Sequence, residues 1–228
     1  MKLFLDTSDV DEIRKHYETG LISGVTTNPS LILKSGGDPH ETLTEISRIF
    51  PDDASISAEV VADTWHEMIS QAQEYENIGK NITIKVPCTK EGLKACFVLR
   101  SKKVPVNVTL VFSVSQAILA ARAHATYISP FVGRVDDQRL DGIGLVERIS
   151  QVYQKHKVYW ETSILAASIR TVEDVELSFR AGADVVTMPP KIFEGMYQHM
   201  LTDKGVELFN QDWKQVANTH VRGPHVGT

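Results

Sequence analysis

The sequence predicts an α/β fold in which eight parallel strands close into a (β/α)8 TIM barrel. Short apolar strands alternate with amphipathic helical stretches along the chain, a pattern typical of parallel sheets connected by helices. About eight such βα units fit within 228 residues, and both values are typical of a closed barrel. Several strands also carry polar side chains on one face. A doubly wound open sheet has the same alternation and is the structural alternative.

The first half of the chain contains four predicted strands, each followed by a helix. Apolar residues three or four positions apart indicate the helices, and Ser8 or Asp9 is the expected cap of the first one. The strands are predicted at residues 2–5, 24–27, 55–60 and 82–86, and the helices at 9–19, 40–49, 64–78 and 91–102.

The second half repeats this pattern without a linker, a low-complexity segment or a close internal repeat. We therefore expect one domain over residues 1–217, followed by a polar tail at 218–228 whose composition is typical of disorder. The strands are predicted at residues 106–110, 127–130, within 158–167 and at 184–188, and the helices at 113–124, 140–156, 171–181 and onward to about 217.

The alternation of side chains along the strands favours the barrel. Successive side chains on a strand point to opposite faces, so Thr83 and Lys85 share one face, opposite the apolar side chains of their strand. The same division separates Asn107 and Thr109 from the apolar set of their strand, Val106, Val108 and Leu110. Helices must cover the apolar face, which leaves the polar face inside the barrel. A polar interior is costly unless it forms a functional site.

Composition excludes several classes of protein. A formal net charge of -5 without a basic stripe argues against nonspecific nucleic-acid binding, although a few arginines can still attract a small anionic substrate. Cys88 and Cys96 form no CxxC pair and are expected to be free thiols in a reducing compartment. The N-terminal segment is interrupted by the charged Asp6 after only a few apolar residues, which argues against a signal peptide. No apolar run approaches the ~20 residues of a membrane helix. We expect a soluble, cytoplasmic protein without a signal peptide.

Lys85 is the leading candidate for a reactive residue. It lies on the predicted inner face at the carboxyl end of a strand, where active sites of TIM barrels are found. A partly desolvated lysine amine there is a candidate nucleophile. The alternative is a lysine that extends from the strand end into solvent.

Asp6 and Glu59 provide acidic groups at the ends of two other strands. By strand alternation, both side chains are expected to point into the barrel, as Lys85 does. Nucleophilic catalysis by a lysine also requires groups that move protons, which carboxylates can do. The alternatives are a helix cap for Asp6 and a purely structural ion pair with Lys85 for Glu59.

Further polar residues follow other strands. Residues 24–30 are rich in small polar groups that suit sugar hydroxyls, although Asn-Pro also favours a turn. Arg134 and Arg170 each lie near a serine in a late βα loop, where phosphate groups often bind, or they are surface arginines. The histidines show no tight ligand spacing such as HExxH, so no metal is expected.

Six motifs identify a resemblance that extends to about Trp213. They are FLDT at 4–7, GVTTNPSL at 24–31, IKVP at 84–87, NVTLVFS at 107–113, SPFVGR at 129–134 and AASIR at 166–170. With these motifs the chain resembles the transaldolase family, in the short-subunit branch that also contains fructose-6-phosphate aldolase. Residues 160–162 match no motif, which leaves the limits of the seventh strand open.

The resemblance implies a (β/α)8 barrel with class I aldolase chemistry and no cofactor. By this resemblance Lys85 forms an imine with the substrate ketone, and Asp6 is the acid–base group for carbon–carbon cleavage. Glu59, with Thr109 and a bound water, moves protons during imine formation and release. The remaining matches are Thr26, Asn28, Asn107 and Ser129 for the dihydroxyacetone portion, and Arg134, Ser168 and Arg170 for the phosphate.

The resemblance also separates the two activities of the branch. Aldolase-type members look like Gln at the position of Glu59 and Tyr at the position of the substrate-binding Phe131, and they lack a match to Asn107. At all three positions this chain resembles the transaldolase type. The expected reaction is dihydroxyacetone transfer between fructose 6-phosphate or sedoheptulose 7-phosphate and an aldehyde acceptor. A fructose-6-phosphate aldolase and a non-catalytic sugar-phosphate binder are the alternatives.

Short-subunit members form rings, often pentamers or decamers, in which the C-terminal helix packs on a neighbour. The resemblance therefore implies a homo-oligomer. The alternative is packing of this helix on its own barrel. An apolar side of the last predicted helix is formed by Val206, Leu208, Phe209, Trp213 and Val216.

Overall fold

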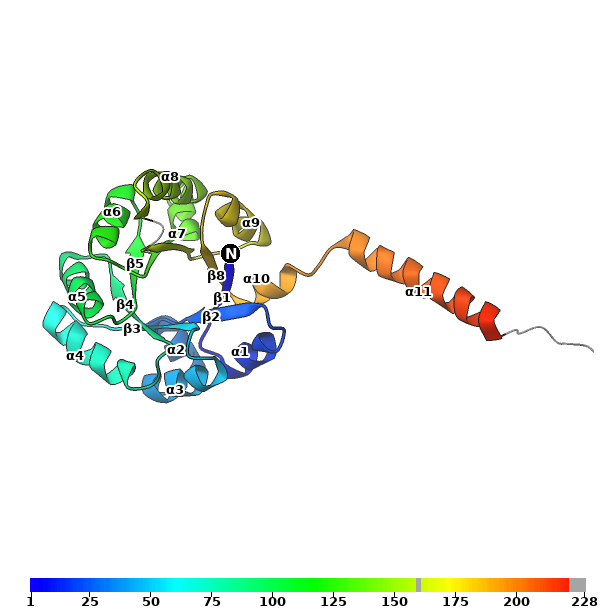
Figure 1. Cartoon of the computed structure of the whole chain (residues 1–228), viewed down its shortest axis with the longest axis horizontal. Helices are drawn as coiled ribbons and strands as arrows, with labels where there is room; N and C mark the ends of the chain where they lie inside the picture. Colours follow the sequence, from blue (N-terminus) through cyan, green and yellow to red (C-terminus); the bar gives the residue numbers. More distant parts are fainter. Residues whose placement is uncertain (159–160, 222–228) are drawn as a thin grey trace, which may run out of the picture. The chain divides into compact units, whose positions relative to one another are not determined.

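The structure, a computed structural model, confirms the predicted fold. It describes residues 1–158 and 161–221, with side chains up to Val216. Eight parallel strands close into a barrel in sequence order, with β8 pairing with β1. Figure 1 shows the strands as an inner ring surrounded by helices. The strands are β1 Lys2–Asp6, β2 Ile22–Thr26, β3 Ser55–Glu59, β4 Ile82–Pro87, β5 Val106–Val111, β6 Tyr127–Pro130, β7 Ser163–Ala166 and β8 Val185–Met188.

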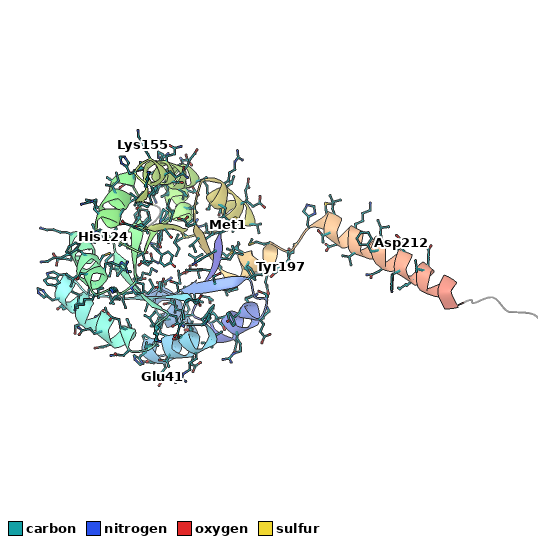
Figure 2. The ribbon with its side chains drawn as sticks, viewed as in Figure 1. Met1, Glu41, His124, Lys155, Tyr197 and Asp212 are labelled. Carbon is teal, nitrogen blue, oxygen red and sulfur yellow. The ribbon has the colours of Figure 1, made fainter. Side chains whose placement is uncertain are left out.

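The helices cover the outer face of the strands. Figure 2 shows Glu41 of α3 and Lys155 of α8 on the outer side of this layer, where both are exposed. The helices are α1 Val10–Tyr17, α2 Pro29–Ser35, α3 Pro39–Ile49, α4 Trp65–Glu76, α5 Lys90–Ser101, α6 Val114–Arg122, α7 Val132–Asp137, α8 Gly142–Lys155, α9 Val172–Arg180, α10 Pro190–Gly195 and α11 Met200–Val221.

Two short helices, α2 and α7, were not predicted, and both follow strands at the mouth of the barrel. Asn28 caps α2 by accepting a hydrogen bond from the backbone N–H of Leu31 at 3.0 Å. The Asn-Pro pair that indicated a turn is therefore the start of a helix, because proline suits the first helical position. α7 has Phe131 at its N-cap without a side-chain hydrogen bond, so the sequence carries no cap signal there.

Asp9 is the residue that caps α1. Its Oδ1 accepts hydrogen bonds from the backbone N–H groups of Asp11 and Glu12, each at 3.1 Å. The capping alternative for Asp6 is therefore excluded, and its carboxylate is available to the barrel interior.

The interior of the barrel contains a small apolar cluster as well as polar side chains. Phe4, Leu165, Ala167 and Val185 form a small apolar cluster inside the barrel, whereas the main core lies between strands and helices. Gly24 on β2 makes this cluster possible. A Cβ atom there would collide with the Ser55 carbonyl oxygen and lie 2.8 Å from the Phe4 ring.

β5 departs from regular alternation at its end. Leu110 has a left-handed backbone with a φ of 59°, and the pairing with β6 shifts between Val108 and Val111. Because of this bulge, the Val111 side chain is fully buried in the core between strands and helices, whereas Leu110 is partly exposed. Regular alternation had placed Leu110 on the apolar face, and this prediction was wrong because an extra residue in a strand reverses the faces that follow.

The chain divides into two compact units, Met1–Phe193 and Glu194–Thr228. The second unit contains α11, whose apolar residues Val206, Leu208, Phe209, Trp213 and Val216 are exposed. α11 continues to Val221, and residues 222–228 of the expected tail lie outside the described part of the chain, as does Trp160. Among the described residues, no helix is long and apolar enough to cross a membrane.

Candidate active site

A cavity opens at the carboxyl ends of the barrel strands. Its volume is about 110 Å³. This is the end of a TIM barrel at which catalytic residues are found. Its walls are formed by Asp6, Thr26, Asn28, Lys85, Thr109, Ser129, Phe131, Arg134, Ala167, Ser168 and Thr187.

Lys85 lines the cavity and is only 5% exposed. Its Nζ donates a hydrogen bond to the backbone carbonyl of Thr27 at 3.0 Å and lies 3.0 Å from Glu59 Oε2. The pairing of β3 with β4 places Glu59 directly beside Lys85. The structure therefore excludes the alternative in which Lys85 extends into solvent. A carboxylate in this position can accept a proton from the lysine.

Asp6 faces the same cavity from β1. Its Oδ1 accepts a hydrogen bond from Thr26 Oγ1 at 2.8 Å. Burial raises the pKa of Asp6 above its usual range, and the Thr26 hydrogen bond and the positive charge of Lys85 oppose this shift. A carboxyl group with a raised pKa is suited to take up and return a proton near neutral pH.

Thr109 presents a buried hydroxyl to the cavity. Its Oγ1 has no hydrogen-bond partner among the residues that the structure describes. A buried hydroxyl without a partner costs about 1–3 kcal/mol. The hydroxyl is therefore available to hold a water molecule or a substrate oxygen in the cavity.

Asn107 lies behind the cavity wall rather than on it. It is fully buried on β5, donates a hydrogen bond to Ser57 Oγ at 3.2 Å and accepts one from Ser129 Oγ at 2.8 Å. Ser129 does line the cavity. In this arrangement Asn107 orients Ser129, a relationship that the sequence did not indicate.

Arg134, Phe131 and Ser168 form the outer part of the cavity. The Arg134 guanidinium lies over the Phe131 ring, 4.9 Å from its centroid. Ser168 has a left-handed backbone with a φ of 59°, and its carbonyl accepts a hydrogen bond from Gly133 N at 3.0 Å. A Cβ atom at Gly133 would collide with this carbonyl, so glycine allows the two loops to approach each other.

Arg170 does not line the cavity. Both of its terminal nitrogens donate hydrogen bonds to the two carboxylate oxygens of Asp137 on α7, and its side chain is half exposed. This ion pair lowers the pKa of Asp137. Asp137 was not recognised in the sequence, because α7 itself was not predicted. Asp137 lies three residues after Arg134 and is acidic. Neither feature indicates that it pairs with Arg170, which lies 33 positions away in the sequence.

Two other groups at the site were missed. Thr187 of β8 lines the cavity, with its Oγ1 2.7 Å from Thr26 Oγ1. A threonine with inward alternation in an otherwise apolar strand was a signal that could have identified it. The Thr27 carbonyl that binds Lys85 has no such signal, because every residue has a backbone carbonyl.

Solved structures similar to this one share its fold at low sequence identity. Thiamine phosphate pyrophosphorylase from Pyrococcus furiosus matches with a TM-score of 0.57 and 14% identity, covering 82% of this chain and 85% of that protein. Dihydrodipicolinate synthase from Rhodopseudomonas palustris matches with a TM-score of 0.57 and 15% identity, over 82% of this chain and 69% of that protein. These likenesses show the barrel alone.

Sequence relatives are much more similar. A probable transaldolase from Paracoccus denitrificans is 51% identical over 217 residues, which cover 95% of this chain and 98% of the relative. A probable transaldolase from Symbiobacterium thermophilum is 49% identical, over 94% of this chain and 97% of the relative. The family model described as transaldolase/fructose-6-phosphate aldolase matches residues 3–220. The chain belongs to the transaldolase/fructose-6-phosphate aldolase family.

Proposed function

We propose that this enzyme is a transaldolase that transfers a dihydroxyacetone unit between sugar phosphates through an imine on Lys85. The observation that carries the proposal is the position of the Lys85 amine. It lies in the cavity, 3.0 Å from Glu59, and Asp6 forms another part of the same wall. Family membership supports a transaldolase-type activity, and these three side chains supply the nucleophile and the proton-transfer groups.

The first step is imine formation. Glu59 accepts a proton from the Lys85 ammonium, and the neutral amine attacks the ketone carbon of fructose 6-phosphate or sedoheptulose 7-phosphate. The carbinolamine oxygen takes up protons and leaves as water, giving a protonated imine. Thr109 is placed to hold the water that carries these protons, because its hydroxyl faces the cavity without a partner among the described residues.

The second step is carbon–carbon cleavage. The Asp6 carboxylate removes the proton from the C4 hydroxyl, the C3–C4 electron pair moves toward the iminium nitrogen, and an aldehyde phosphate leaves. The dihydroxyacetone unit remains on Lys85 as an enamine. Attack of the enamine carbon on erythrose 4-phosphate or glyceraldehyde 3-phosphate reverses these steps, and Asp6 returns its proton to the new hydroxyl. Hydrolysis of the imine then releases the product ketose. This exchange belongs to the pentose phosphate pathway.

The outer part of the cavity is proposed to bind the substrate phosphate. Arg134 and Ser168 line it, and an arginine fork suits a phosphate dianion. Arg170 is held by Asp137 in the structure, so a phosphate that reaches Arg170 must share it with this carboxylate. Asn28 and Ser129 line the same cavity, and their polar side chains suit the hydroxyls of the dihydroxyacetone portion.

Phe131 favours transfer over release of free dihydroxyacetone. Its ring lines the cavity and offers no hydrogen-bonding group to a water molecule. The enamine is therefore not readily protonated before an acceptor arrives. Glu59 also differs from the Gln of the aldolase type. The alternative is a fructose-6-phosphate aldolase, the other activity named in the family description.

The decisive experiment combines trapping with a coupled assay. Borohydride added with fructose 6-phosphate should leave a reduced adduct on Lys85, located by peptide mass spectrometry. Turnover of fructose 6-phosphate should require erythrose 4-phosphate. Turnover without this acceptor would identify an aldolase, and no turnover would identify a binding protein. An adduct on a different lysine would contradict the mechanism.

Assembly into a homo-oligomeric ring, a pentamer or a decamer in the cytoplasm, is proposed as well. The support is the exposed apolar side of α11, which includes Phe209 and Trp213. Burial of such side chains on association is favourable by about 25 cal/mol per Å² of apolar surface.

A further inference from the structure

A pair of buried threonine hydroxyls continues the hydrogen-bonding network of Asp6 across the barrel. Thr26 Oγ1 donates to Asp6 Oδ1 at 2.8 Å, and the same oxygen lies 2.7 Å from Thr187 Oγ1. Thr26 and Thr187 are 3% and 2% exposed, so solvent does not replace these contacts. β1 pairs with β2 on one side and β8 on the other, with Thr26 in register with Asp6 and Thr187 in register with Phe4, so the two threonines reach this network from the two neighbouring strands.

The number of protons sets the direction of this network. An ionised carboxylate only accepts hydrogen bonds, so the single Thr26 proton is directed to Asp6. The contact between the two threonines must then use the Thr187 proton, with Thr26 Oγ1 as the acceptor. A hydroxyl that accepts a hydrogen bond becomes a stronger donor, by roughly 10–30% per bond.

We infer that Thr187 is a positioning residue for the proposed reaction, whose hydroxyl keeps the Thr26 proton directed at the Asp6 carboxylate. The inference rests on the proposed function, because it concerns the base that removes the C4 proton. Thr187 acts through Thr26, and its effect is confined to the ionised form of Asp6, the form that begins carbon–carbon cleavage.

The surroundings of Asp6 make the Thr26 hydrogen bond important for keeping its carboxylate ionised. Lys85 from β4 and Arg134 from α7 favour the carboxylate, and Glu59 from β3 opposes it. Burial outweighs these charges and raises the pKa of Asp6. Loss of the Thr187 hydroxyl leaves Thr26 a weaker donor, because its oxygen no longer accepts a hydrogen bond. The carboxylate is then less stabilised, so the acid limb of the pH profile moves to higher pH.

The test compares Thr187→Val, which removes the hydroxyl at nearly constant volume, with Thr187→Ser, which keeps it. Thr187→Val should lower kcat for fructose 6-phosphate cleavage roughly two- to tenfold at neutral pH, the effect of one hydrogen bond, with KM nearly unchanged. The acid limb of kcat should move to higher pH. Thr187→Ser should restore both. Borohydride trapping of dihydroxyacetone on Lys85 should be unaffected in either variant, because imine formation does not use Asp6.

The barrel interior offers a matched control. Thr83 Oγ1 and Ser55 Oγ form another buried hydroxyl pair at 2.8 Å, and neither residue lines the cavity. Thr83→Val should leave kcat and its pH profile as in the wild type. If Thr187→Val does not show a folded melting transition, Thr187→Ala replaces it with the same expected shift.

Each outcome decides the inference. An acid limb that stays in place in a folded Thr187 variant overturns it, as does an equal shift in Thr83→Val or a failure of Thr187→Ser to restore the wild-type profile. Absence of a Lys85 adduct in the active wild-type enzyme overturns the proposed function and the inference together. A normal adduct with an unmoved acid limb overturns the inference alone.

Discussion

Replacing Lys85 with methionine should abolish turnover and also destabilise the barrel, because it leaves the Glu59 carboxylate without its partner. The two charged atoms are 3.0 Å apart, and the side chains are 7% and 18% exposed. Removing one member of a buried ion pair typically costs about 3–5 kcal/mol. The residual exposure of Glu59 favours the lower end, about 3 kcal/mol, and a chain of this length loses about 2–4 °C per kcal/mol, or about 6–12 °C in Tm.

A second substitution separates the two effects of the first. Lys85→Met/Glu59→Gln replaces the unpaired carboxylate with a neutral amide, so it should regain at least half of the lost Tm while remaining inactive. The control is the surface pair Lys80–Asp52, which has a similar separation of 3.2 Å but side chains that are 83% and 75% exposed. Surface pairs contribute about 0–1 kcal/mol, so Lys80→Met should change Tm by no more than about 4 °C.

Thermal melts followed by circular dichroism, together with the coupled assay, measure both effects. The reasoning would be refuted if the double variant melted no higher than Lys85→Met, because Glu59 would then not be the source of the loss. It would also be refuted by turnover in either Lys85 variant.

Three other predictions follow from the cavity and from α11. Arg134→Ala should raise KM for phosphorylated substrates roughly tenfold or more, since a charge-assisted contact contributes about 1.5–3 kcal/mol, while unphosphorylated substrates change little; an equal rise for both in steady-state assays would indicate a structural role. Phe131→Tyr should raise the ratio of free dihydroxyacetone released to sedoheptulose 7-phosphate formed, because its hydroxyl can hold a proton-donating water. An unchanged ratio in the folded variant would assign this control to another residue. Light scattering at micromolar concentration should give a ring-sized mass, and a monomer would reject the assembly proposed from Phe209 and Trp213.

The sequence by itself determined the fold class and the face on which the reactive groups lie. Alternation along a strand is a local property, fixed by backbone geometry every two residues. It therefore placed Lys85 and Thr109 inside the barrel without knowledge of any distant contact. The regular order of strands and helices predicted a parallel α/β sheet for the same reason, because each unit was recognisable from its own residues, and the polar strand faces favoured its closure into a barrel.

Only the tertiary structure decided which of these groups meet. The contacts that departed from expectation join segments far apart in the chain, such as Arg170 with Asp137 and Thr26 with Thr187, which are 33 and 161 positions apart. Closure of the barrel and the register of its strands set these contacts, and neither is encoded in one segment. The bulge at Leu110 shows the limit of local reasoning, since a single left-handed residue reversed the face of the residue after it.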